Sequence, residues 1–394
     1  MGNTRRFEIV IPAGQSVFYP GQVIQGQVCV EIAESMRMRG ITISCISSSE
    51  VMWRVGKTNQ RGVEHYLNLK LTLYGNPPPN GDNVVLPAGS HMFPFQFVLP
   101  VNLPGSYEGE PGCYVRHWMT AVIDRPFKFN KEYKMVFTVA SILDLNAIPD
   151  AGAPLQTNDS KSMTCCCCCY NGEVTAKFRV DKRGFVPGES IAVYGAVTDT
   201  SNSGINGVDV DFTRRTVYTA ESGAVIQHKL HIGRLHHNQV ELGASDIWNG
   251  EKLRIPAVPP SYLAGCSIID IQYYIEIRVY LHCCASDLRL ALPLIIGTVP
   301  LRETVQQNVG LRQHRRNYQN SAGYTRDSET RAVTNQPQAA SASAPLENFD
   351  DLEMPPPSYQ ECVFGKVDTT NSEERFTAGN LKFAPSYTYY DNFV

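Results

Sequence analysis

Five residues near the C-terminal end of the chain, Pro355-Pro356-Pro357-Ser358-Tyr359, have the composition of a peptide ligand. Consecutive prolines hold φ near the polyproline II value, so the segment is already extended and loses little conformational entropy on binding. WW domains bind such segments by packing prolines between aromatic side chains, and the tyrosine supplies a second contact. We therefore predict a WW-domain-binding site at Pro356, Pro357 and Tyr359, with a plain spacer as the alternative.

A second feature whose side chains could take part in chemistry is an unbroken run of cysteines in the middle of the chain. Neighbouring cysteines cannot all form disulfides within one chain, which favours a reducing compartment. Acylation of two or more of them would attach the chain to a membrane, at about 0.8 kcal/mol per buried methylene. A buried apolar patch and a run without function are the alternatives. The candidate lipidation sites are Cys165, Cys166, Cys167, Cys168 and Cys169.

Zinc binding is a competing use of these thiols, because Cys165 and Cys168 have C-x-x-C spacing and His282-Cys283-Cys284 could add ligands. Structural zinc sites normally show two spaced pairs on turns. Here the second group is three adjacent residues of a strand-like segment, whose side chains alternate between faces and cannot converge. We therefore expect no metal and no cofactor.

An enzymatic alternative would combine the thiol of Cys113 with His117 or the His236-His237 pair, as in a cysteine hydrolase. The sequence has no nucleophile elbow, no phosphate-binding glycine loop and no paired-carboxylate motif. Free cysteine usually behaves as a small buried hydrophobe. A structural role for Cys113 and His117 is therefore favoured, and no enzymatic activity is expected.

Composition limits the class of protein. The chain has 394 residues, of which 43% are hydrophobic and 19% charged, enough for two or three globular domains. The formal net charge of -3 gives no basic excess, so nucleic acid is not expected as a partner. No apolar run resembles a signal peptide or reaches membrane-spanning length, which predicts a soluble cytoplasmic protein.

Strand signals dominate from Phe7 to about Thr298. Short β-branched and aromatic runs are broken every eight to twelve residues by Gly, Pro or Asn, a pattern typical of antiparallel sandwiches. The pattern occurs twice, because Tyr19-Pro20-Gly21-Gln22 has a counterpart in Val186-Pro187-Gly188-Glu189. Pro followed by Gly is the signature of a type II turn. An all-β fold of two duplicated sandwiches is therefore predicted.

Four segments follow from these patterns. Residues 1–148 and 171–304 are the two sandwich domains, and the polar stretch 149–170, which ends in the cysteine run, is the linker. Residues 305–394 carry too little apolar surface to offset the entropy of ordering and are predicted to be disordered. The basic pairs Lys182-Arg183 and Arg214-Arg215 are interpreted as solvated charges on β-edges rather than as a phosphate site.

An ordered set of segments resembles the arrestin domain-containing proteins, or α-arrestins. The set begins with Phe18-Tyr19-Pro20-Gly21-Gln22-Val23-Ile24-Gln25-Gly26 and continues through Ser106-Tyr107-Glu108-Gly109 and Tyr114-Val115-Arg116 to Asp124-Arg125-Pro126. It ends with the linker cysteines, Gly184-Phe185-Val186-Pro187-Gly188-Glu189 and the tail Pro-Pro-x-Tyr. The resemblance spans Phe7 to about Thr298 together with the tail motif.

This resemblance implies two arrestin-like sandwiches and a role as a trafficking adaptor. Pro356, Pro357 and Tyr359 would bind WW domains of HECT-type ubiquitin ligases, while the sandwiches hold membrane receptors or transporters as cargo. Cargo would then be ubiquitinated at the inner face of the plasma membrane and sorted into endosomes. A retromer-like sorting subunit, which would not need the tail motif, is the alternative.

One departure from the family pattern concerns the second tail motif. Members of the family often carry a second Pro-Pro-x-Tyr, but Ala384-Pro385-Ser386-Tyr387 has alanine in place of the first proline. Two ligands on one tail raise avidity for tandem WW domains through effective concentration. We therefore expect Pro385 and Tyr387 to form only a weak second site.

Overall fold

Buried and exposed side chains alternate along the long strands, as expected for sheets that cover a core with one face. In β10 (Tyr114–Asp124) every second residue is buried, and β19 (Ile269–Leu281) has nearly the same pattern in the second half of the chain. Such strands assemble into antiparallel sheets around two sandwich cores. The computed structural model describes residues 4–76, 81–165, 169–201, 204–241, 243–281, 286–307, 357–370 and 377–391.

The first sandwich, called the N-domain below, follows the start of the chain. Its smaller sheet has the order β1 (Thr4–Val10), β3 (Val23–Ile32) and β8 (Gly89–Val98). Its larger sheet has the order β2 (Val17–Phe18), β11 (Lys131–Val139), β10, β5 (Gly40–Val55) and β6 (Thr58–Gly75), with β9 (Tyr107–Glu108) beside β10. The remaining short elements are η1 (Pro12–Gly14), β4 (Met36–Met38) and its partner β7 (Val84–Leu86).

The second sandwich, called the C-domain, repeats this plan. One sheet has the order β12 (Leu155–Cys165), β13 (Cys169–Val180), β15 (Ser190–Asp199) and β18 (Ser245–Arg254). The other has the order β14 (Gly184–Phe185), β20 (Leu288–Ile296), β19, β16 (Ile205–Thr219) and β17 (Val225–His237). A short turn, η2 (Leu145–Ala147), lies between the domains, and one helical segment spans 302–307.

The repeated turn found in the sequence opens each domain. Gly21 has a φ of 82° and Gly188 one of 99°, the left-handed conformation that glycine adopts at little cost. In each turn the amide after the glycine donates to the carbonyl three residues earlier, over 3.1 Å. The short strand before the turn pairs in parallel with the last long strand of its sheet, β2 with β11 and β14 with β20. The predicted all-β architecture of two sandwiches is confirmed.

The linker differs from the sequence-based expectation. Most of the stretch predicted as a linker, 149–170, belongs to β12 and the start of β13, where Leu155 pairs with Val180 and Cys165 with Cys169. β12 is an edge strand of its sheet, and polar residues occupy both of its faces. Its composition therefore resembles a linker, although its backbone pairs with β13 from Leu155 to Cys165, with one irregularity between Ser162 and Thr164.

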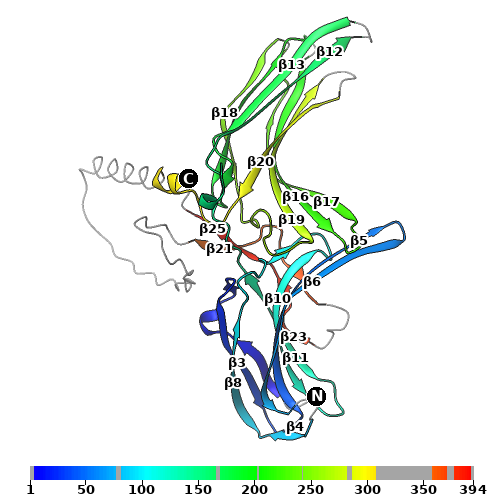
Figure 1. Cartoon of the computed structure of the whole chain (residues 1–394), viewed down its shortest axis with the longest axis vertical. Helices are drawn as coiled ribbons and strands as arrows, with labels where there is room; N and C mark the ends of the chain where they lie inside the picture. The colour runs from blue at the N-terminus through cyan, green and yellow to red at the C-terminus, as the bar shows by residue number, and fades with distance from the viewer. Residues whose placement is uncertain are drawn as a thin grey trace, which may run out of the picture.

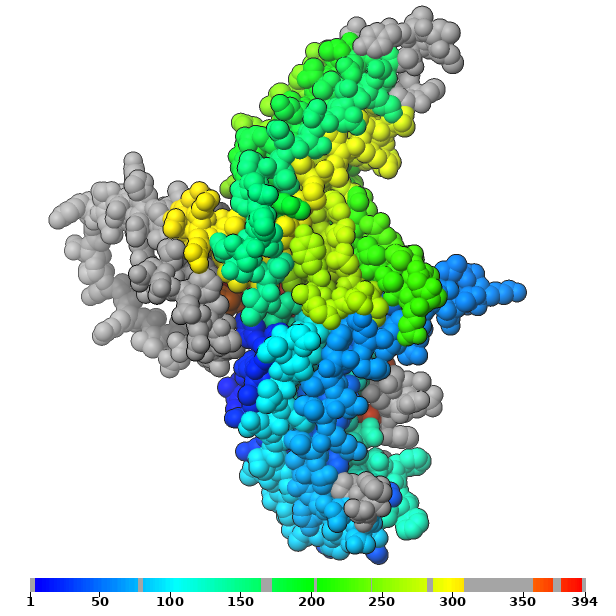
Figure 2. Space-filling model, viewed as in Figure 1, coloured from blue at the N-terminus to red at the C-terminus, as the bar shows by residue number. Residues whose placement is uncertain are grey.

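The two domains meet end to end at a junction, called the waist below (Figures 1 and 2). The hydroxyl groups of Tyr107 from the N-domain and Tyr218 from the C-domain lie 3.0 Å apart, and Tyr107 also contacts the Thr216 hydroxyl at 3.2 Å. Val51 and Val115 of the N-domain belong to the same buried cluster as the C-domain core. The domains therefore share an apolar interface as well as a chain connection.

The end of the chain returns to this waist, which corrects the expectation that 305–394 is disordered throughout (Figure 1). Segments 357–370 and 377–391, called the tail below, form short strands that pair with one another and with β11. These pairings depend on the body of the protein, because segments this short have no core of their own. The tail strands are β21 (Ser358–Glu361), β22 (Val367–Asp368), β23 (Thr377–Asn380), β24 (Lys382–Phe383) and β25 (Ser386–Tyr389).

Candidate peptide-docking site at the domain junction

The predicted WW ligand lies partly outside the described residues. Pro355 and Pro356 fall outside them, whereas Pro357 and Tyr359 are both half-buried. Tyr359 belongs to β21, and its backbone pairs with Thr388 of β25. The structure therefore places the tyrosine of the motif on the body of the protein, within a two-stranded ladder.

The ring of Tyr359 packs against the N-domain. It meets the ring of Tyr19 edge to face, with centroids 6.4 Å apart, in a small patch that also contains Val17 and Ala140. The Tyr359 hydroxyl is buried without a hydrogen-bond partner among the described residues. A buried unpaired hydroxyl disfavours docking. At this position Tyr359 therefore gains packing contacts for its ring but no hydrogen bond for its hydroxyl.

The degenerate second motif is buried more deeply. Ala384, Pro385 and Tyr387 are all buried, and only 6% of Tyr387 is exposed. The hydroxyl of Tyr387 donates to the carbonyl oxygen of Ser106 in the N-domain, over 3.2 Å. Burial raises the pKa of Tyr387 well above its ordinary value. In this conformation Pro385 and Tyr387 are core-like residues rather than an exposed ligand.

β25 and the residue after it contact both domains. The Ser386 amide donates to the Thr138 hydroxyl of the N-domain over 3.1 Å. On the C-domain side, Arg254 Nε donates to the Tyr389 hydroxyl over 3.1 Å, and the Tyr390 hydroxyl donates to the Thr298 carbonyl over 2.8 Å. The strand therefore bridges the waist.

A buried cation lies beneath the tail. Arg214 of β16 is 4% exposed, and its Cζ lies 5.3 Å from the ring centroid of Tyr107 and 4.7 Å from that of Phe364 in the tail. Its Nε and Nη1 have no hydrogen-bond partner among the described residues. The interpretation of Arg214 as a solvated edge charge is wrong, because the tail and the waist cover it. The neighbouring Arg215 instead pairs with Glu276.

The two ends of the cysteine run, Cys165 and Cys169, pair at the end of the β12–β13 ladder that lies farthest from the waist (Figure 1). Cys165 and Cys169 are paired strand residues, and Cys166, Cys167 and Cys168 lie outside the described residues. Among the residues that the structure describes, no group of three or more His, Cys, Asp or Glu side chains has the arrangement of a metal site. His282-Cys283-Cys284 also lies outside the described residues.

The residues of the hydrolase alternative have structural contacts instead. Cys113 and His117 are both buried, and His117 Nδ1 lies 2.7 Å from the Ser47 hydroxyl. Burial lowers the pKa of His117 to about 3, while a backbone contact with Pro104 acts in the opposite direction. Burial also raises the pKa of the Cys113 thiol, which disfavours the nucleophilic thiolate.

The histidine pair is engaged with carboxylates. His236 Nδ1 lies 2.6 Å from Asp209 and His237 Nδ1 lies 2.7 Å from Asp246. The ring of His237 also stacks on Trp248 at a centroid distance of 3.8 Å. These contacts fix both imidazole rings on the C-domain sheets, and within the described part of the chain neither ring is hydrogen-bonded to a thiol.

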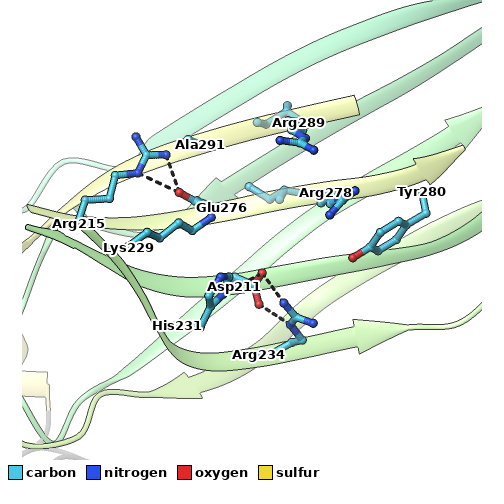
Figure 3. Close-up of a pocket in the computed structure, with 12 residues that line it drawn as sticks. Asp211, Arg215, Lys229, His231, Arg234, Glu276, Arg278, Tyr280, Arg289 and Ala291 are labelled. Atoms are coloured by element: carbon cyan, nitrogen blue, oxygen red, sulfur yellow. Dashed lines mark hydrogen bonds and ion pairs between the residues drawn. The ribbon is translucent and has the colours of Figure 1, made fainter. Parts of the chain in front are cut away.

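A charged hollow of about 380 Å³ lies over β16, β17, β19 and β20 (Figure 3). Most of its charges are paired between neighbouring strands. Arg215 lies 2.5 Å from Glu276, and Arg234 lies 2.6 Å from Asp211. Cross-strand pairs of this kind stabilise a sheet. The lining still carries an excess of positive charge, because five cationic side chains face the two carboxylates of Asp211 and Glu276.

Nothing in the described part of the chain suggests a membrane-spanning helix, since none of its helices is long and apolar enough to cross a bilayer.

Comparison with known proteins agrees with this architecture. Residues 7–146 match the family model of the arrestin (or S-antigen) N-terminal domain, and residues 171–301 match that of the arrestin C-terminal domain. The chain is 32% identical over 301 residues to human arrestin domain-containing protein 1, covering 76% of this chain and 66%, just under two thirds, of that relative. It is 27% identical over 434 residues to arrestin domain-containing protein 17 of Caenorhabditis elegans, covering 98% of each chain.

A further relative is human thioredoxin-interacting protein, which is 29% identical over 299 residues and is covered to 74% of its length, with 75% of this chain aligned. The matched domains coincide with the two sandwiches. The family suggested by the sequence segments is therefore confirmed. This chain belongs to the arrestin family and, within it, to the arrestin domain-containing proteins, or α-arrestins.

Proposed function

We propose that this chain is a trafficking adaptor that links membrane receptors or transporters to WW-domain-containing HECT-type ubiquitin ligases. The observation that carries the proposal is the peptide Pro355-Pro356-Pro357-Ser358-Tyr359 in a chain whose body consists of two arrestin domains. Pro357 and Tyr359 are half-buried at the surface of the molecule rather than within either sandwich core, so a partner can reach them by displacing a short strand.

The mechanism is proximity. The adaptor forms and breaks no covalent bond, and the ligase transfers ubiquitin to lysines of the cargo. Holding ligase and cargo on one molecule raises the local concentration of each for the other, and their encounter becomes intramolecular. Ubiquitinated cargo is then internalised and sorted into endosomes. The rate of cargo modification should therefore follow occupancy of the Tyr359 site.

The cysteine hairpin supports a location at the inner face of the plasma membrane and at endosomes. A run of thiols at the end of a two-stranded hairpin can carry acyl chains away from both sandwich cores. Two chains suffice for stable attachment. Acyl exchange on the full chain should therefore detect hydroxylamine-sensitive label at Cys165 to Cys169, and replacing these five residues by serine should abolish it. Absence of label in cells would remove the membrane anchor and leave the adaptor role intact.

The ligase-binding role is tested with a fluorescent peptide spanning residues 350–364 and purified WW domains of a HECT-type ligase. Binding should require Tyr359, so Tyr359→Ala in the peptide should weaken it by at least about tenfold, since a large aromatic contact is lost. Val363→Ala in the same peptide is the matched control and should have no effect. A peptide that fails to bind any such domain would refute the proposed function.

A further inference from the structure

The tail presents the WW ligand in a form that a WW domain cannot use. A polyproline II helix has no internal hydrogen bonds, and its backbone is free to be solvated. In the tail, by contrast, the backbone from Ser358 to Glu361 pairs as a strand with the backbone from Ser386 to Tyr389. The ring that a WW domain must take is packed on Tyr19. Ligase binding and this docked arrangement therefore exclude one another.

The docked arrangement is held mainly by the far end of the tail. Tyr387, Tyr389 and Tyr390 are each at most 8% exposed, and each has a hydroxyl hydrogen bond to the body. Tyr390 belongs to a small apolar cluster of the C-domain, and its amide donates to the Pro187 carbonyl over 3.1 Å. We call this region, Ser386 to Tyr390, the anchor.

The motif end is held less firmly. Tyr359 is half-buried, and its hydroxyl has no partner among the described residues, in contrast to the three anchor tyrosines. The Ser358 hydroxyl lies 3.0 Å from both the Tyr389 carbonyl oxygen and the Asp391 carboxylate and can donate its one proton to either, which ties β21 to the end of the tail rather than to the body. Release of the motif thus requires opening of the β21–β25 pair, and its cost depends on the anchor.

A second contact fixes the middle of the tail. β23 adds a strand to the free edge of β11, with Gly379 opposite Lys134. A Cβ atom at Gly379 would lie 1.9 Å from the Lys134 carbonyl oxygen, so only glycine fits this pairing. The tail therefore fits the body at three separate places: the β11 edge, the waist and the Tyr19 patch.

We propose that the waist is a binding site for the chain's own anchor, and that this contact withholds Tyr359 from WW domains until the tail opens. This inference rests on the proposed function, because withholding Tyr359 has an effect only if WW domains bind it. It gives the degenerate motif a different role from the one expected: Pro385 and Tyr387 serve as the internal ligand of the body instead of as a second ligase site. The protein then exchanges between a closed form and an open form that is competent for ligase binding.

The test compares WW-domain affinity of the full chain with that of three variants, measured by titration calorimetry. Tyr387→Ala and Gly379→Ala lie in the tail and leave both sandwiches unaltered. If the closed form comprises more than about nine-tenths of the molecules, both variants should bind at least about tenfold more tightly, because apparent affinity scales with the competent fraction. Val363→Ala, at a tail residue that is 51% exposed, is the matched control and should bind as the unaltered chain does.

Hydrogen exchange of the full chain provides a readout that is independent of any ligase. Amides of Ser386 to Tyr389 should be protected in the unaltered chain, and Tyr387→Ala should release both these amides and those of Ser358 to Glu361. Unprotected amides in the unaltered chain would overturn the closed form. Equal WW affinity of the 350–364 peptide and the unaltered chain would also overturn it while leaving the proposed function standing.

Discussion

The hydroxyl of Tyr387 and the carbonyl oxygen of Ser106 lie 3.2 Å apart, a contact across 281 positions of sequence that ties the end of the chain to the N-domain. Ser106 is 1% exposed, and its own hydroxyl accepts from the Val139 amide over 2.9 Å. Tyr387 therefore binds to a rigid, hydrogen-bonded corner of the sandwich, which makes its single hydroxyl a measurable part of tail docking.

Tyr387→Phe keeps the buried ring and removes only this hydrogen bond. We expect docking of the tail to weaken by about 0.5–1.5 kcal/mol, the usual net contribution of such a bond. The amides of β25 should then exchange about two- to tenfold faster, as measured by hydrogen–deuterium exchange. Tyr262→Phe, at a tyrosine that is 45% exposed, is the control and should leave these rates unchanged. Unaltered exchange in Tyr387→Phe would show that the ring alone holds the strand.

Arg214→Met tests whether the buried guanidinium stabilises the waist. The two contacts with aromatic rings are each worth about 0.5–2 kcal/mol, whereas burial of a cation without a carboxylate partner costs several kcal/mol. Methionine fills a similar volume without a charge, so we expect an unfolding temperature that is equal or higher. Arg215→Met, which breaks the pair with Glu276, should lower it. If the unfolding temperature of Arg214→Met alone fell by several degrees, the contacts of the buried guanidinium would outweigh the cost of its burial.

The long strands and the domain repeat could be predicted from the sequence because each depends on local patterns. Alternation of apolar and polar residues identifies strands such as β10 and β19 without knowledge of their partners. The Pro-Gly pairs at 20–21 and 187–188 indicate turns because the backbone there needs a positive φ. The family resemblance followed from the order of such segments.

The tail strands and the deep burial of Arg214 could not be predicted in this way. Strands of two to four residues show no periodicity, and their pairing depends on an edge and a waist built by residues 92 to 281 positions away. Arg214 sits next to Arg215 in the sequence, yet strand alternation sends one side chain into the waist and the other to the surface. β12 was missed because an edge strand can be polar on both faces.

His117→Gln should reduce the loss of stability at acid pH. The folded protein keeps His117 neutral because burial lowers its pKa to about 3, whereas the unfolded chain takes up a proton near pH 6.5. Between these values the unfolded state binds more protons, so the free energy of unfolding falls as pH decreases, by up to about 1.4 kcal/mol per pH unit. Urea unfolding between pH 4 and 7 should give a shallower slope for His117→Gln.

The control for this slope is His65→Gln, at an exposed histidine of β6. Its slope should equal that of the unaltered protein, because this substitution changes an exposed side chain and removes no buried group. Glu189 acts with the opposite sign, since burial raises its pKa and the folded state holds that proton more tightly. The contribution of His117 is therefore the difference between the pH slopes of the unaltered protein and His117→Gln. Equal slopes for the unaltered protein, His117→Gln and His65→Gln would contradict a buried neutral imidazole.

Gly188→Ala, a change in the C-domain rather than in the tail, should release the tail from the body. A Cβ atom there would lie 2.2 Å from the Tyr390 carbonyl oxygen, and the φ of 99° adds strain of about 1 kcal/mol for a residue with a side chain. Gly21→Ala in the equivalent N-domain turn has similar backbone strain, but its Cβ would meet only Val101, at 3.2 Å. Both variants should lose comparable domain stability, and only Gly188→Ala should expose the β25 amides to exchange and tighten WW binding. Equal tail protection in the two variants would show that Tyr390 does not rest on this turn.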